Sequence, residues 1–147
     1  MHRMKRASSY MVAAACLFLA AAGPQAKSQP AGSATLSYEF FRDKVQPIFL
    51  AQRPGHTRCV VCHTINNAPL HLVSLSPGAT TWNEEQSRRN FQLVQKVVVP
   101  GYEGSKLLTH PLAEQAGGDP NHGGAKHFAS QNDPEWKTLQ AFVLGAK

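Results

Sequence analysis

The stretch Arg58-Cys59-Val60-Val61-Cys62-His63, RCVVCH, raises the main question about this chain of 147 residues. Two cysteines separated by two residues can form a redox dithiol, supply half of a zinc site, or attach a haem when a histidine follows at once. A redox dithiol is expected between a strand and a helix, whereas a helical segment and a loop precede this motif, and His63 then has no role. A zinc site needs two further ligands, and His122 and His127 are close to the usual spacing.

The order Cys-x-x-Cys-His favours the haem. Two thiols add to the two vinyl groups on one edge of a porphyrin, and the adjacent histidine then reaches the iron. In this interpretation Cys59 and Cys62 bind one haem c covalently, and His63 is the proximal iron ligand. Covalent attachment also retains the cofactor in an exported protein, from which free haem would diffuse away.

Residues 1–22 have the layout of a secretory signal peptide. Arg3, Lys5 and Arg6 precede an uncharged apolar run over residues 10–22, which ends in small residues that suit a cleavage site. The run is shorter than the roughly 18–20 residues that cross a bilayer, so we expect cleavage rather than a retained anchor. The mature protein is therefore expected to be exported, periplasmic or extracellular, with no membrane span.

Cleavage changes two properties of the chain. The formal charge falls from +6 to +3, because three basic residues and no acidic one lie within residues 1–22. The remaining chain has no run of Lys or Arg that would bind phosphates, so nucleic acid is not an expected partner. Cys16 is also removed, which leaves Cys59 and Cys62, too close in the chain to staple a fold with a disulfide.

Residues 23–36 are rich in Pro, Gly, Ser and Ala and predict a flexible linker. We expect one domain over residues 37–147. Its first helix is predicted within residues 37–50, where apolar side chains recur at helical spacing and Ser37 can cap the first turn. Pro47 removes a backbone donor and clashes with the preceding turn, so it predicts a kink or an early end.

Two further helices are expected. In the first, Thr81 is the candidate cap, a stripe of Phe91, Val94 and Val98 follows, and residues 100–101, Pro-Gly, stop the helix. The last helix is the clearest. Asp133 is its predicted cap, and Pro134 is the predicted first helical residue. The predicted apolar face consists of Trp136, Leu139 and Val143, and Gly145 is expected to end the helix.

No segment alternates with the period of a strand, so the predicted class is all-α, with about three to four helices and long Gly- and Pro-rich loops. A domain of this size with so many loop residues buries limited apolar area. A haem would supply the missing apolar body, and the predicted fold is a small cytochrome c-like one packed around it.

The second axial ligand comes from a short list. All three methionines, Met1, Met4 and Met11, lie in the predicted signal, so the mature chain cannot form a His/Met haem. His56 and His71 are close in sequence to the motif and are expected to be exposed or locally hydrogen-bonded. The distal ligand is then a downstream histidine or a lysine, unless the position is open. The downstream histidines are His110, His122 and His127.

Several segments together resemble the small cytochrome c domains of planctomycete and acidobacterial exported proteins. They are VQPIF (45–49) before CVVCH, GSKLLTHPL (104–112), GGDPNHGGAKHF (117–128) and a final helix with a tryptophan, and the resemblance covers residues 37–147. In such relatives a Met-Pro or His-Gly-Gly element before the last helix supplies the distal ligand. The resemblance therefore implies His122, with His110 and His127 as alternatives. The insertion QRPGHT (52–57) departs from the common pattern.

Two imidazole ligands leave no vacancy for a substrate, which favours one-electron transfer over catalysis. We therefore expect a monohaem electron carrier, not an enzyme, that acts on redox partner proteins. Two alternatives remain open. With an open distal site, the protein would be a peroxidase-like haem enzyme or a gas or redox sensor. It could also be a small haem subunit of a larger respiratory or extracellular assembly.

Overall fold

The computed structural model describes residues 34–65, 68–124 and 126–147. Within these ranges the chain is helical, and its only β-type pairings are isolated bridges between Arg53 and His56 and between Leu112 and Phe128. The all-α class is thus confirmed for the described residues. The helical elements are α1 (Tyr38–Phe40), η1 (Phe41–Val45), α2 (Gln46–Leu50), α3 (Cys59–His63), α4 (Glu84–Gln95), α5 (Lys106–Thr109), η2 (Glu114–Ala116) and α6 (Pro134–Val143). The predicted signal peptide (1–22) and most of the predicted linker (23–36) lie outside the described residues.

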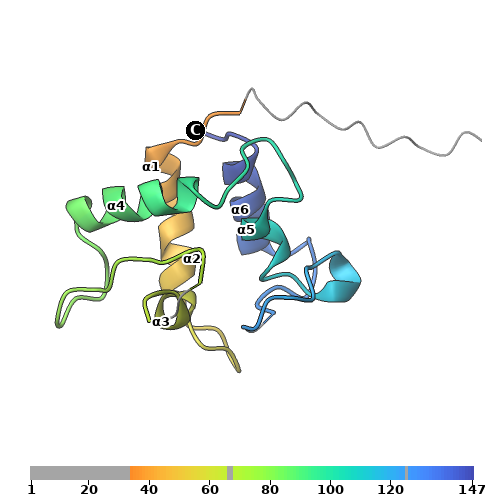
Figure 1. Cartoon of the computed structure of the whole chain (residues 1–147), viewed down its shortest axis with the longest axis horizontal. Coiled ribbons are helices and arrows are strands. Elements are labelled where there is room, and N and C mark those ends of the chain that lie inside the picture. The colour runs from red at the N-terminus through yellow and green to blue at the C-terminus, as the bar shows by residue number, and fades with distance from the viewer. Residues whose placement is uncertain (1–33, 66–67, 125) are drawn as a thin grey trace, which may run out of the picture.

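The first three elements form one continuous helix, which appears as a single column in Figure 1. Ser37 caps it as predicted, since its Oγ accepts a hydrogen bond from the Phe40 amide at 3.2 Å. Of the two outcomes predicted at Pro47, a kink or an early end, the early end does not occur, and the helix is irregular there instead. The turn before Pro47 is a π-helix, in which the Gln46 amide bonds to the Phe41 carbonyl five residues back. The wider turn accommodates the missing proline donor, so the helix continues to Leu50.

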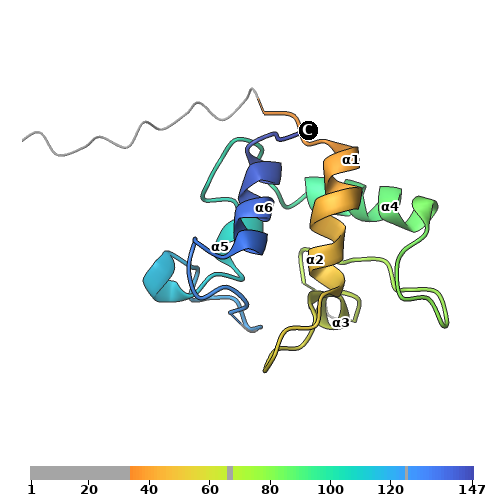
Figure 2. The same ribbon diagram turned by 180° about the vertical axis from the view of Figure 1, so that it is seen from behind.

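The core forms around Phe41 on this column. Its ring is 5.5 Å from that of Phe91 in α4, 5.9 Å from Phe142 in α6 and 6.2 Å from Phe49 in α2. Figures 1 and 2 show α4 on one side of the column and α6 on the other. The aromatic rings therefore join three helices that are far apart in sequence.

The last helix agrees with its prediction throughout. The Asp133 side chain accepts from the amides of Glu135 and Trp136, Pro134 is the first helical residue, and Trp136 and Val143 are buried. Gly145 follows with a φ of 93°, a left-handed conformation suited to a helix end.

The middle helix differs from its prediction at both ends. Its cap is Asn83 rather than Thr81, because Asn83 and Gln86 form a reciprocal capping box. The helix ends at Gln95, before the run of three valines (97–99) and ahead of the predicted Pro-Gly stop. β-Branched residues lose side-chain freedom in a helix, and here Val98 still packs into the core from the following turn.

The two ends of the folded body meet. A Cβ placed on Gly145 would lie 3.2 Å from the Cβ of Ala34, and one on Gly101 would lie 3.4 Å from the same atom. The Gly101 amide also donates to the Val143 carbonyl at 2.8 Å. Among the described residues, no helix has the length and apolar character needed to cross a membrane.

Candidate functional site

The motif CVVCH itself forms the short helix α3. Val60 is buried in the core, and the Thr64 hydroxyl donates to the Val60 carbonyl at 2.8 Å, which closes the last turn. Cys59 and Cys62 are free and partly exposed. Residues three positions apart lie on the same side of a helix, so the two thiols share one face of α3.

The protonation of Cys59 bears on the choice between a redox dithiol and an attachment site. Burial raises the pKa of the Cys59 thiol above its ordinary value. A reactive dithiol instead has a cysteine with a lowered pKa, because the thiolate is the nucleophile. No strand precedes α3 in the described residues either, so the dithiol interpretation has no support from this environment.

His63 is the last residue of α3, and its ring is held in one orientation. Its Nδ1 lies 2.8 Å from the carbonyl oxygen of Leu70. A carbonyl only accepts, so Nδ1 carries the proton and Nε2 keeps a free lone pair. Hydrogen bonds of this kind fix the tautomer of metal-binding histidines. His63 is thus prepared to bind a metal through Nε2.

The loop before α6 brings His122 opposite His63. The two ring centres are 6.3 Å apart, and the ring planes differ by only 12°. Two imidazoles that bind one metal from opposite sides have ring centres about 6 Å apart, given metal–nitrogen bonds of about 2.0–2.1 Å and about 1.1 Å from nitrogen to ring centre. The distance between the ring centres is therefore compatible with one ion bound between the two histidines, which are far apart in sequence.

The environment of His122 keeps its imidazole neutral. Burial, together with the positive charges of His110, His63, Lys126 and His127, lowers its pKa to about 4. Its Nδ1 is buried and has no hydrogen-bond partner among the described residues. A buried polar atom without a partner costs free energy, and a neutral imidazole has a lone pair for a metal. Both properties fit a ligand at this position.

The neighbouring glycine is required by the close approach of the loop to the His122 ring. A Cβ on Gly124 would lie 2.9 Å from Cε1 of His122. Any side chain at position 124 would therefore displace the ring. In the sequence element His122-Gly123-Gly124, the glycine at position 124 therefore has a local steric reason.

The alternative ligands His110 and His127 also lie in this region. The His110 ring is 5.3 Å from that of His122, but its Nε2 is already bonded to the Asp119 carboxylate at 3.0 Å. His127 instead lies beside His56, with ring centres 5.1 Å apart, and burial lowers its pKa. The ring of His122 thus lies near those of both His63 and His110, whereas the ring of His127 lies beside that of His56.

His56 and His71 were both expected to be exposed or locally hydrogen-bonded. The backbone of His56 is locally hydrogen-bonded, since its amide donates to the Arg53 carbonyl at 3.1 Å and its carbonyl accepts from the Gln52 side chain at 2.7 Å. His71 is exposed, whereas His56 is half-buried against His127 and its Nδ1 is buried without a partner in the described chain. Arg53, in the same insertion, forms ion pairs with Asp133 and Glu135 at the start of α6 and donates to the His127 carbonyl. For the zinc interpretation, the described residues contain no group of three or more His, Cys, Asp or Glu arranged to hold a metal ion.

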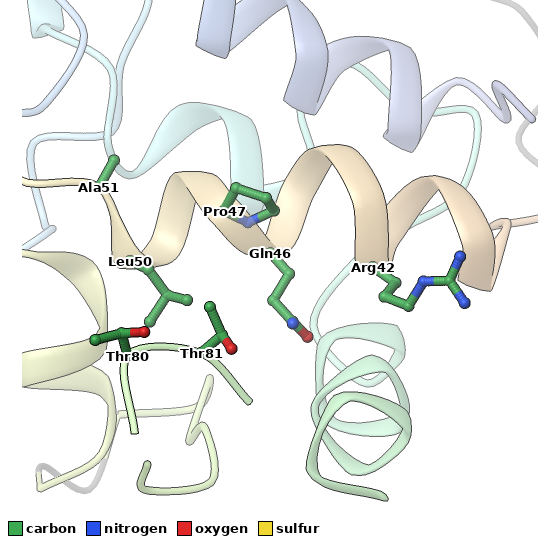
Figure 3. Close-up of a pocket in the computed structure, with 7 residues that line it drawn as sticks. All are labelled: Arg42, Gln46, Pro47, Leu50, Ala51, Thr80 and Thr81. Atoms are coloured by element: carbon green, nitrogen blue, oxygen red, sulfur yellow. The ribbon is translucent and has the colours of Figure 1, made fainter. Parts of the chain in front are cut away.

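A separate hollow lies beside α2. It measures about 410 Å³ and is lined by Arg42, Gln46, Pro47, Leu50, Ala51, Thr80 and Thr81. Figure 3 shows Leu50 of α2 reaching toward the two threonines. None of the predicted site residues lines it, so it is not part of the candidate site.

Sequence reasoning missed two contributors to the site. The Leu70 carbonyl cannot be recognised from a side-chain pattern. Asp119 was not among the expected site residues, whereas it binds His110 and precedes His122 in an Asp-x-Asn-His sequence that is typical of an Asx turn. Comparisons of the chain with protein-family models, curated proteins and solved structures find no match.

Proposed function

We propose that residues 37–147 form a small cytochrome c-like domain that binds one haem c and transfers single electrons. Cys59 and Cys62 would hold the haem covalently, and His63 and His122 would be its axial ligands. The observation that carries the proposal is the spacing of the two imidazoles, 6.3 Å between nearly parallel rings, directly beside a Cys-x-x-Cys-His helix.

Each of the proposed site residues would have a distinct role in binding the haem. Cys59 and Cys62 present two thiols on one face of α3, as two thioether bonds from one edge of a porphyrin require. The Leu70 carbonyl orients His63, and the neutral His122 offers a lone pair from the other side. When bound, haem supplies the one-electron couple of its iron. The histidines on both sides would leave no open position for a substrate, which favours electron transfer over catalysis.

The proposed setting is outside the cytoplasmic membrane, with redox partner proteins or the subunits of a larger assembly. The signal-like layout of residues 1–22 supports export. Purification of the native protein separates the two settings, since an assembly subunit brings other chains with it and a free carrier does not.

The deciding experiment compares the optical and electron paramagnetic resonance spectra of the wild-type protein, made with haem-attachment machinery, with those of His122→Ala. We expect a low-spin bis-histidine haem in the wild type and its loss in the variant. His71→Ala, an exposed histidine, is the matched control and should keep the wild-type spectrum.

Other outcomes identify what is wrong. A low-spin spectrum unchanged in His122→Ala moves the distal ligand to His110 or His127. A high-spin wild type that binds carbon monoxide readily points to the peroxidase-like enzyme or the sensor. Absence of covalent haem rejects the proposal altogether.

A further inference from the structure

The loop that carries His122 is fastened to the preceding segment by Asp119. Its Oδ2 accepts from Nε2 of His110 at 3.0 Å, and its Oδ1 accepts from the amide of Asn121 at 2.8 Å and from the Asn121 side chain at 3.0 Å. Its own amide donates to the Thr109 carbonyl at 2.9 Å. One residue thus joins the end of α5 to the turn directly before His122.

The ionisation of Asp119 is consistent with these contacts. The hydrogen bond from the Asn121 amide is the main cause that lowers its pKa below the ordinary value, and the charge of His110 acts in the same direction. The carboxylate therefore stays charged at neutral pH. Lys126 adds a third link, because its Nζ donates to the carbonyl oxygens of both Asp119 and His110.

His110 connects this cluster to the candidate ligand. Its ring lies 5.3 Å from that of His122, with an angle of 28° between the planes. Asp119 holds His110 by its Nε2, and each of the two side chains is about a quarter exposed. The His110 ring is therefore fixed at one edge by a charged hydrogen bond while it packs beside His122.

Resting on the function proposed above, we propose that Asp119 is a positioning residue that holds the distal histidine in place. It acts through the turn at Asn121 and through the His110 ring, and it slows the dissociation of His122 from the iron. Without it, the loop would have to keep His122 in position next to two glycines, whose backbone freedom is large. Fixing each loosened residue costs conformational entropy.

The test measures how fast carbon monoxide binds to the reduced holoprotein, because a ligand can bind only after His122 leaves. Partners that orient metal ligands typically change metal affinity about 10–100-fold when mutated, so Asp119→Ala is expected to raise the rate at least about tenfold. Asp119→Asn keeps an oxygen for the Asn121 turn but loses the charge, and it should have a smaller effect. Glu114→Gln removes an exposed carboxylate of the same segment and should leave the rate unchanged.

A second variant separates positioning from general stability. His110→Phe keeps a ring beside His122 but cannot bond to Asp119. If the two act together, His110→Phe also raises the rate, and the double variant with Asp119→Asn adds less than the sum of the two effects. The midpoint of thermal unfolding is followed in parallel, since a merely structural role would lower it without this coupling.

The outcomes keep this inference distinct from the proposed function. A low-spin wild type whose rate is the same in Asp119→Asn, Asp119→Ala and His110→Phe rejects the role of Asp119 and leaves the cytochrome proposal standing. Additive effects that follow the loss in thermal stability also reject it. A chain that attaches no haem rejects both the cytochrome proposal and the role of Asp119. If Asp119→Ala does not fold, the carbon monoxide binding rates of Asp119→Asn and His110→Phe still test whether Asp119 positions His122.

Discussion

Two halves of the molecule are held together in different ways. The helical half, made of α1, η1, α2, α4 and α6, is joined by aromatic rings around the fully buried Phe41. The histidine half, made of α3 and residues 109–128, is joined by backbone hydrogen bonds between loops, such as those from Ala113 to Phe128 and from Phe128 to Pro111. Buried apolar side chains of the second half, Val60, Leu112 and Phe128, belong to the same core, but its imidazoles are only partly buried at the edge of that core.

The largest expected effect is on the histidine half. The double substitution Cys59→Ala and Cys62→Ala should abolish covalent haem, because no thiol remains to form a thioether bond in the mature chain. Mass spectrometry of the denatured protein measures this directly. Val61→Ala, an exposed residue between the two cysteines, should retain the cofactor. Haem that remains covalently bound in the double variant would contradict the role of these cysteines.

The helical half should depend most on Phe41. Phe41→Ala removes a fully buried ring that contacts three other aromatic rings, so we expect a loss of about 3–5 kcal/mol in the free energy of unfolding. Chemical denaturation of the holoprotein measures it. Val99→Ala, at an exposed position, should cost less than about 0.5 kcal/mol. Equal losses in the two variants would mean that the aromatic cluster does not hold this half together.

The pH dependence of the haem spectrum tests the environment of His122. Burial depresses the pKa of this histidine to about 4, so the side chain stays neutral and able to bind metal down to that pH. The low-spin spectrum should therefore persist as the pH is lowered through 6.5, the ordinary value for histidine, and convert to high-spin only near or below about pH 4. An acid titration followed by optical absorption measures the midpoint. A midpoint near pH 6 would mean that His122 is more solvated than the structure indicates.

The smallest effect is expected at the start of α4. Asn83→Ala removes the cap and one member of the capping box, and it should cost about 1 kcal/mol of stability. Chemical denaturation measures the loss. Asn132→Ala, an exposed asparagine outside any helix, is the matched control. Thr81→Ala, at the position that the sequence favoured, should have no comparable effect.

The fold was predictable from the sequence where several local signals agreed. In α6 the cap, the first-turn proline, the apolar face and the final glycine all indicate the same helix. At the start of α4 two candidate caps competed, and the reciprocal Asn83–Gln86 bonds decided in favour of the later one. The π-turn before Pro47 could not be predicted, since the sequence shows only that a regular helix is unfavourable there. α5 and η2 are too short to produce a periodic pattern.

The candidate site was predictable in its residue types more than in its geometry. The spacing of Cys59, Cys62 and His63 favours haem attachment, and the absence of methionine from residues 23–147 limits the expected distal ligand to few residues. Which histidine faces His63 depends on contacts between distant segments, so the sequence alone left His110 and His127 open. The place of His56 beside His127 was not predicted, because it is a contact between two segments that are far apart in the sequence.

The meeting of Ala34 with Gly145 has a consequence for how this domain can be joined to other proteins. Both ends of the folded body leave it at one point, next to Gly101. A domain with adjacent ends can be inserted into a surface loop of a host protein, or attached to a neighbour on either side, without distortion of its core. α3, which carries the Cys-x-x-Cys-His motif, lies at the other end of the helical column from that point, so such a fusion would leave the motif accessible (Figures 1 and 2).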